Sequence, residues 1–175
     1  EITNWAGQWN VYEWDVINET LSNKLLMEIL GYQEMAEWFR IAESNMVNAG
    51  CKLLINDYQI ISAMSATRKP GWYTNRRDRY MANIDQIIAD GGRVDRIGFQ
   101  SRIKHERRDP QLIYDRLEEW GNAYGLEMVG TEFEVINSNP GDWMEYIYTD
   151  EERAQITEEM MTQYYSHPLV TGLNA

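Results

Sequence analysis

The sequence is most informative at Trp14-Asp15-Val16-Ile17-Asn18-Glu19, an apolar run that ends abruptly in an amide and a carboxylate. A short apolar run of this kind predicts a buried strand. A second run, Leu126-Glu127-Met128-Val129-Gly130-Thr131-Glu132, ends in the same way. In barrel enzymes the C-terminal ends of the strands carry the chemistry. A glycosidase needs at least two carboxylates, and two strand ends could supply them. A single glutamate at a strand end is, however, more often a solvated residue or a salt-bridge partner.

Composition narrows the class of protein. The chain has 175 residues, of which 43% are hydrophobic, and a net charge of −12. That length fits one domain with a real core, over residues 1–175. Phosphate binding needs a basic surface, so we expect no nucleic-acid partner. No apolar run approaches the roughly 20 residues that span a bilayer, so we expect no membrane partner. The N-terminus lacks a signal-peptide pattern, which a mature secreted protein would have lost.

The only cysteine is Cys51, which excludes an intrachain disulfide and leaves no zinc-type cluster. It precedes an apolar run, so we expect an inert, buried thiol. The sequence therefore predicts neither a metal nor another cofactor.

Apolar runs alternate with amphipathic stretches along the chain, and this alternation predicts an α/β fold with a parallel sheet and crossover helices. Asp109-Pro110 predicts a helix start, with the aspartate as N-cap. Thr149, which precedes three acidic residues, predicts a second helix start. The expected strands are residues 12–18, 52–56, 94–100, 126–131 and 169–173. The expected helices are residues 32–49, 75–89 and 110–124, with a last helix from residue 149 to just before His167.

Five segments in this order resemble motifs of glycoside hydrolase family 10, the endo-β-1,4-xylanases. They are the run at residues 14–19, Leu54-Ile55-Asn56-Asp57-Tyr58, Val94-Asp95-Arg96-Ile97-Gly98-Phe99-Gln100-Ser101, Thr131-Glu132-Phe133-Glu134 and His167-Pro168-Leu169-Val170-Thr171-Gly172. The resemblance implies a (β/α)8 TIM barrel and a retaining mechanism. Complete barrels have about 250 residues, so this chain would hold only about strands four to eight. Five strands with open edges would not close a barrel, so we expect either a fragment or a second polypeptide that supplies the N-terminal units.

The resemblance also assigns catalytic roles. Glu19 would be the general acid/base and Glu132 the nucleophile, with carboxyl groups about 5–5.5 Å apart as retention requires. Glu19 must be protonated when it meets the glycosidic oxygen, whereas Glu132 must be ionised to attack the anomeric carbon.

Other residues would contact the substrate if the resemblance holds. Asn18 would bind the sugar 2-hydroxyl, or else cap a turn, and Gln100 would line the same pocket. Asn56 and Tyr58 would lie on the rim near the leaving group, or else make loop hydrogen bonds. The aromatic side chains Trp72, Trp143 and Tyr148 lie in long loops where sugars can stack, and Trp143 is the strongest candidate of the three.

Two positions depart from the family pattern. Arg102 stands where the family usually has a histidine beside the nucleophile, and Glu134 stands where it has an aspartate. We expect the longer acid to reach the arginine and form a Glu132–Arg102–Glu134 array, in which the guanidinium keeps Glu132 ionised over a wide pH range. His105 is an alternative substitute for the missing histidine, but its charged surroundings favour a solvated loop.

The expected partner is a β-linked polysaccharide such as xylan, and the resemblance implies a secreted or cell-surface location. Two alternatives stay open because of Arg102 and Glu134. One is a catalytically inert, carbohydrate-binding relative, and the other is a retaining hydrolase of a different β-linked polysaccharide.

Overall fold

The computed structural model of the chain describes residues 10–142 and 145–175, so the candidate Trp143 lies outside the described residues. The chain divides into two compact units. Unit 1 comprises Glu1–Asp57 and Asn75–Gly98, and unit 2 comprises Tyr58–Thr74 and Phe99–Ala175.

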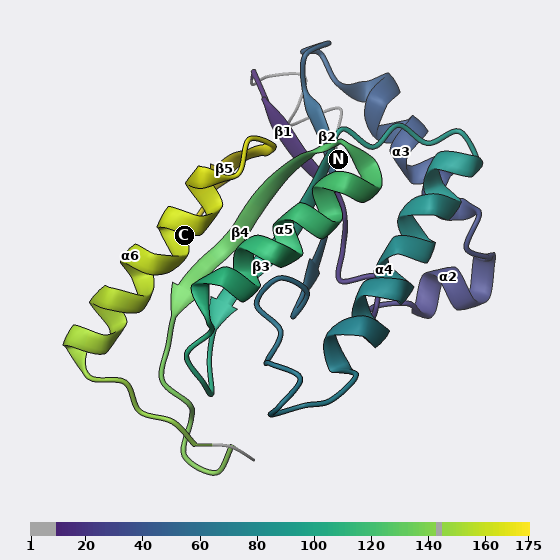
Figure 1. Ribbon diagram of the computed structural model, residues 1–175. Helices are drawn as coiled ribbons and strands as arrows, with labels where there is room; N and C mark the ends of the chain where they lie inside the picture. The colour runs from purple at the N-terminus through teal and green to yellow at the C-terminus, as the bar shows by residue number, and fades with distance from the viewer. Residues whose placement is uncertain (1–9, 143–144) are drawn as a thin grey trace. The chain divides into compact units, whose positions relative to one another are not determined.

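The predicted alternation of strands and helices is confirmed (Figure 1). The strands form one sheet in the order β1-β2-β3-β4-β5, and the pairs β1–β2 and β4–β5 are parallel. This sequential order is the one that (β/α) barrels have. In chain order the elements are β1 (Glu13–Asn18), α2 (Leu25–Leu30), α3 (Glu34–Asn45), β2 (Lys52–Tyr58), α4 (Trp72–Ala89), β3 (Arg96–Ile103), α5 (Pro110–Tyr124), β4 (Glu127–Val135), α6 (Asp150–Ser166) and β5 (Val170–Leu173).

In unit 1, helix α3 packs on β1, and the short helix α2 packs on α3. The core contains Phe39 from α3 and Leu53 and Ile55 from β2, all fully buried. Strand β2 is buried along almost its whole length, as expected for a strand covered on both faces. The parallel register pairs Asn18 with Asn56, so the polar ends of β1 and β2 lie next to each other.

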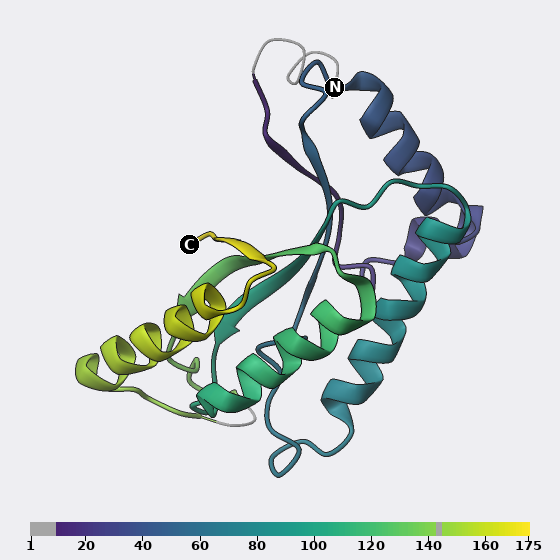
Figure 2. The ribbon, with the colours of Figure 1, turned by 45° about the horizontal axis from the view of Figure 1, so that its top comes forward.

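In unit 2, helices α5 and α6 lie side by side and α6 packs on β4 and β5 (Figures 1 and 2). The predicted helix starts are confirmed. The Asp109 side chain accepts a hydrogen bond from the backbone N–H of Gln111, and Thr149 forms a capping box with Glu152. Helix α5 ends at Gly125, whose left-handed φ of 62° suits glycine.

Several expected element bounds were wrong in detail. The helix expected from residue 75 begins at Trp72, so Trp72 is part of α4 and not of the preceding loop. The helix expected at residues 32–49 spans only Glu34–Asn45, because Met46 takes an extended conformation and ends it. Val47 therefore lies beyond the helix and is 69% exposed. The short helix α2 was not predicted, since its run of leucine and isoleucine has no capping residue. Cys51 is buried as expected, and burial raises the pKa of its thiol.

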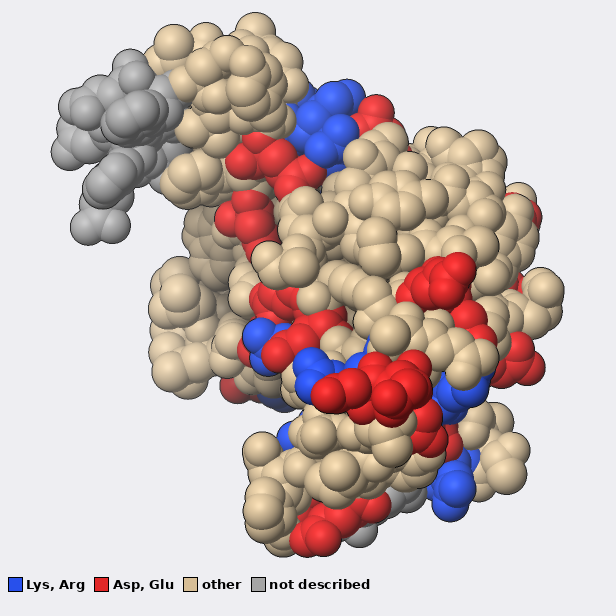
Figure 3. Space-filling model, turned by 90° about the vertical axis from the view of Figure 1, so that its left-hand side faces the viewer, with Lys and Arg blue, Asp and Glu red and all other residues tan. Residues whose placement is uncertain are grey.

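Acidic side chains are spread over the face shown in Figure 3, with fewer basic side chains between them. Among the described residues, no helix is both long and apolar enough to cross a membrane.

Candidate active site

Among the described residues, four other than glycine have left-handed backbone conformations, and all four lie in the C-terminal part of a strand or just beyond it. They are Glu19 (φ 60°), Gln59 (φ 51°), His105 (φ 73°) and Glu132 (φ 51°). Such conformations are costly for residues with a side chain, and they gather at functional sites. Both glutamates that the sequence singled out are among the four, so an unusual backbone conformation marks each of them within its own unit.

Glu19 is half-buried, and hydrogen bonds within unit 1 hold both its backbone and its side chain. Its backbone N–H donates to the carbonyl of Asn56 at 2.8 Å, and its own carbonyl accepts from the N–H of Asn23 at 2.8 Å. The Asn23 side-chain amide also donates to Glu19 Oε2 at 3.0 Å. Asn23 therefore supports both the turn and the carboxylate, a role that the sequence did not indicate.

Asn18 and Asn56 meet side by side at the ends of β1 and β2. Asn56 is buried, and its Nδ2 donates to Asn18 Oδ1 at 3.1 Å, whereas Asn18 is exposed. A Cβ on Gly98 would lie 2.7 Å from Asn56 Oδ1, so the glycine leaves room for this amide. The structure thus brings Asn18 and Asn56 together and orients the Asn18 amide.

A buried ion pair lies directly after these asparagines. Arg76 Nη2 donates to Asp57 Oδ1 at 2.9 Å, and the two side chains are 5% and 0% exposed. Asp57 Oδ2 accepts from Thr20 Oγ1 at 3.1 Å and from the backbone N–H of Leu21 at 2.9 Å. Asp57 therefore links helix α4 to the segment that follows Glu19.

Replacement of Arg76 by methionine is expected to lower the free energy of unfolding by about 3–5 kcal/mol, because it leaves the Asp57 carboxylate buried without its cation. Urea unfolding followed by circular dichroism measures the loss. Arg77→Met is the matched control, since Arg77 pairs with Asp78, whose side chain is 64% exposed, and should cost less than about 1 kcal/mol. Equal losses in the two variants would contradict an anchoring role for the buried pair.

Glu132 lies in unit 2 beside Arg102 and Glu134. Arg102 Nη2 is 3.2 Å from Glu132 Oε2, and Arg102 Nε is 3.8 Å from Glu134 Oε2. The side chains of Arg102 and Glu132 are 54% and 35% exposed, so water screens these ion pairs in part. The backbone beside Glu132 is fixed to the last strand, as the N–H of Phe133 donates to the carbonyl of Asn174 at 2.7 Å.

Gln100, on β3, is 6% exposed, and its carbonyl accepts a hydrogen bond from Ser62 Oγ at 3.0 Å. Tyr58 ends β2 and is half-buried. Tyr148 is 3% exposed, so its expected place on a sugar-stacking surface was wrong. Its ring packs against that of the more exposed Tyr146, with ring centroids 4.6 Å apart. Burial raises the pKa of its hydroxyl to about 12.

His105 differs from the solvated residue expected from its charged neighbours. It is half-buried, and its Nδ1 lies 3.1 Å from the hydroxyl of Ser138. Helix α6 ends at His167, as expected, and that side chain is buried.

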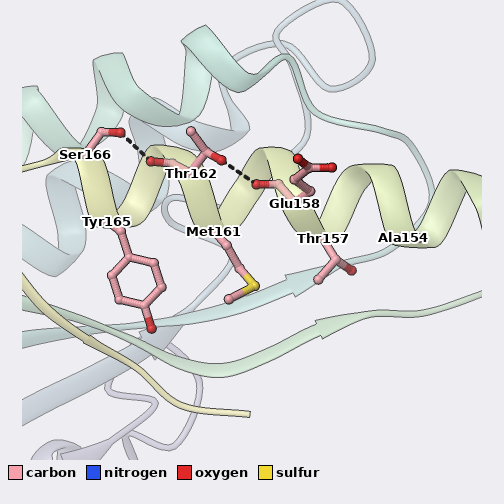
Figure 4. A pocket seen from close by; sticks show the side chains of 7 residues that line it. All are labelled: Ala154, Thr157, Glu158, Met161, Thr162, Tyr165 and Ser166. Atoms are coloured by element: carbon pink, nitrogen blue, oxygen red, sulfur yellow. Dashed lines mark hydrogen bonds between the residues drawn. The ribbon is translucent and has the colours of Figure 1, made fainter.

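Elsewhere in unit 2, an open hollow runs along one exposed side of α6 (Figure 4). All of its lining residues belong to that helix, and Met161 and Tyr165 point outward on the same side. It contains no strand-end residue and so is not part of the candidate site. Among the described residues there is no group of three or more His, Cys, Asp or Glu side chains that could hold a metal ion.

The fold and the site together define a class of protein. A parallel α/β sheet with one glutamate directly after β1 and another in the C-terminal part of β4, both half-buried, has the arrangement of a barrel-type glycoside hydrolase.

Comparison with known families identifies the group within this class. The family model for glycosyl hydrolase family 10 matches residues 2–175, so the chain belongs to that family. Among curated proteins, no relative matches.

Solved structures show the same fold. A thermostable mutant of a xylanase from Cellvibrio japonicus superposes with a TM-score of 0.73 at 17% identity, covering 99% of this chain and 57% of that one. Xylanase 10B from Thermotoga petrophila in complex with xylobiose superposes with a TM-score of 0.72 at 22% identity. The match covers 99% of this chain and 50% of that one. An endoxylanase from a sugarcane soil metagenome superposes with a TM-score of 0.75 at 18% identity. The match covers 99% of this chain and 55% of that one. The chain thus spans about half the length of these xylanases and forms part of a TIM barrel.

Proposed function

We propose that the protein is a retaining endo-β-1,4-glycanase that hydrolyses xylan, with Glu19 as general acid/base and Glu132 as nucleophile. One observation carries the proposal. In a chain of glycosyl hydrolase family 10, Glu19 directly after β1 and Glu132 in the C-terminal part of β4 both have the left-handed backbone that is rare outside glycine, and both are partly exposed to solvent.

In the first step, Glu132 attacks the anomeric carbon while Glu19 gives its proton to the departing glycosidic oxygen, which forms a covalent glycosyl-enzyme. In the second step, Glu19 takes a proton from water, and the water displaces Glu132 from the sugar. Asn18, whose side-chain oxygen accepts a hydrogen bond from Asn56, would bind the 2-hydroxyl of the sugar. Gln100, Asn56 and Tyr58 would line the pocket around it, with Trp143 as a sugar-stacking surface.

Xylan is the proposed substrate because the relative from Thermotoga petrophila binds xylobiose. Further βα units, from the same protein or from a second polypeptide, would complete the barrel, since the relatives are about twice as long. A secreted or cell-surface location would give the enzyme access to its polysaccharide.

A hydrolysis panel on xylan, cellulose and mannan tests the proposal with the intact protein that carries this sequence. We expect xylan to be cleaved fastest, and proton NMR of the first product to show the retained β-anomer. Inversion would overturn the assigned mechanism, and a preference for another polysaccharide would overturn the substrate.

A carbohydrate-binding relative without turnover is the second candidate. The ion pair between Arg102 and Glu132 favours it, because the guanidinium lies against an oxygen of the proposed nucleophile. Binding of xylan without release of reducing sugar would support this candidate.

Replacement of Arg102 by methionine is expected to move the acid limb of the kcat/KM–pH profile upward, because it removes the cation that lies 3.2 Å from Glu132 Oε2. Arg107→Met is the matched control, because Arg107 pairs with Glu159 on α6. An unchanged acid limb would show that Arg102 does not support the nucleophile.

A further inference from the structure

We propose that Asn23 is a positioning residue for the general acid/base, and that its amide decides which oxygen of Glu19 carries the proton. The inference rests on the proposed function, in which Glu19 gives its proton to the departing glycosidic oxygen. That step needs the proton on the carboxyl oxygen that faces the leaving group. A contact that reserves the other oxygen therefore acts directly on the transfer.

The contact joins two residues of the turn that follows β1 in unit 1. The side-chain Nδ2 of Asn23 donates to Glu19 Oε2 at 3.0 Å. The backbone N–H of Asn23 donates to the carbonyl of Glu19 at 2.8 Å and closes the turn. Glu19 itself has a left-handed φ of 60°. The turn that begins there thus brings residue 23 back beside the side chain of residue 19.

Two further side chains of unit 1 hold the middle of this turn. Asp57 Oδ2 accepts from Thr20 Oγ1 at 3.1 Å and from the backbone N–H of Leu21 at 2.9 Å. Arg79 Nη2 donates to the carbonyl of Leu21 at 3.0 Å. Both Thr20 and Leu21 are buried. The turn is therefore fixed before a substrate arrives, which is what a preorganised contact from Asn23 requires.

The hydrogen bond makes the two oxygens of the Glu19 carboxyl group unequal. The amide nitrogen of Asn23 can only donate, so it needs an acceptor in both charge states of the glutamate. When Glu19 takes up a proton, Oε2 remains that acceptor and the proton goes to Oε1. Oε1 gives this proton to the glycosidic oxygen in the first step and takes one from water in the second.

The two proposed catalytic glutamates have different polar partners, and each partner suits its role. Glu132 must stay ionised to attack the sugar, and the cation of Arg102 lies 3.2 Å from its Oε2. Glu19 must gain and lose a proton in every cycle, and its Oε2 accepts from a neutral amide instead. A cation there would oppose uptake of the proton, whereas an amide holds the oxygen without adding charge. Asn23 can therefore position the acid/base throughout the reaction.

Replacement of Asn23 by leucine keeps the shape of the side chain and removes the donor. In the intact protein we expect kcat on xylan to fall about tenfold with KM unchanged. An activated aryl xylobioside needs no proton on its leaving group, so the variant should form the glycosyl-enzyme from it at the normal rate. Asn23→Gln keeps a donor and should recover most of the loss on xylan.

Asn45→Leu is the matched control, because the Asn45 amide donates to the carbonyl of Ile41 within α3 and should alter neither substrate. Loss on xylan alone, with recovery in Asn23→Gln, supports the positioning role. An equal loss on both substrates would show that Asn23 only maintains the turn, and no loss on either would show that the contact is idle. Both of these results overturn the inference.

The NMR resonances of the Asn23 side-chain amide give a readout independent of turnover. In the intact, isotope-labelled protein, one amide proton should stay hydrogen-bonded both above and below the titration of Glu19. Its chemical shift should change once between the two states, and this change should be absent from Glu19→Gln. That result supports the inference even if no glycan is hydrolysed, in which case only the proposed function fails. Loss of the hydrogen bond on protonation would place the proton on Oε2 and overturn the inference.

Discussion

Replacement of Glu132 by alanine is expected to lower the turnover of xylan by roughly 10⁴–10⁶-fold, the range typical for loss of a nucleophile. Glu134, two residues further along β4, contacts a different nitrogen atom of Arg102. Reducing-sugar release over several hours measures the residual rate.

A small external anion distinguishes a lost nucleophile from a misfolded site. With azide and an activated aryl xylobioside, Glu132→Ala should regain activity and give the α-glycosyl azide, because the anion attacks from the side that the carboxylate left open. Glu134→Ala is the matched control and should lose less than about tenfold, since Glu134 only contacts the arginine. A Glu132→Ala variant that hydrolyses xylan at the normal rate would remove Glu132 from the mechanism.

Replacement of Glu19 by glutamine is expected to lower the turnover of xylan by about 10²–10⁴-fold, the contribution typical of a general acid. Glutamine keeps the size of the side chain and its contact with Asn23 but cannot give a proton to the leaving group. The loss should depend on the leaving group. An aryl xylobioside that needs no protonation should form the glycosyl-enzyme at nearly the normal rate and then release it slowly.

A burst of aryl alcohol followed by a slow steady state is the signature to measure. Glu28→Gln is the matched control, because Glu28 is an exposed partner of Lys24 on α2 and should not alter either phase. If Glu19→Gln lost the same factor on xylan and on the activated substrate, Glu19 would have a structural role instead of an acid/base role.

Most of the fold could be predicted, because its signals are local. Alternating apolar and amphipathic runs indicate strands and crossover helices, and the caps at Asp109 and Thr149 mark where helices begin. The same reasoning failed at the end of α3, where Met46 continues the helical spacing but its backbone is extended. The spacing of apolar residues indicates which face of a helix a residue would lie on. It does not indicate the residue at which the helix ends.

The candidate site was predictable only in part. Glu19, Glu132 and Asn18 follow apolar runs, so their places at or near the C-terminal ends of strands could be foreseen, although β4 continues past Glu132 to Val135. The left-handed backbones of Glu19 and Glu132 could not be foreseen, because no glycine marks those positions. Asn23 and Arg76, the buried partner of Asp57, were also missed. Asn23 contacts Glu19 across the turn that follows β1, and Arg76 contacts Asp57 from helix α4, and neither contact follows from the spacing of apolar residues. Tyr148 was misplaced because aromatic residues in loops serve cores and sugar-binding surfaces alike.

The central claim is that Glu132 attacks the sugar, and trapping of the covalent intermediate tests it most directly. The intact protein is incubated with an activated 2-deoxy-2-fluoro-xylobioside, which slows release of the glycosyl-enzyme, and the adduct is located by peptide mass spectrometry. The account predicts a single fluoroxylobiosyl group on Glu132, formed quickly in the wild type and absent in Glu132→Ala. An adduct on another residue, or no adduct under conditions where xylan is hydrolysed, would contradict it.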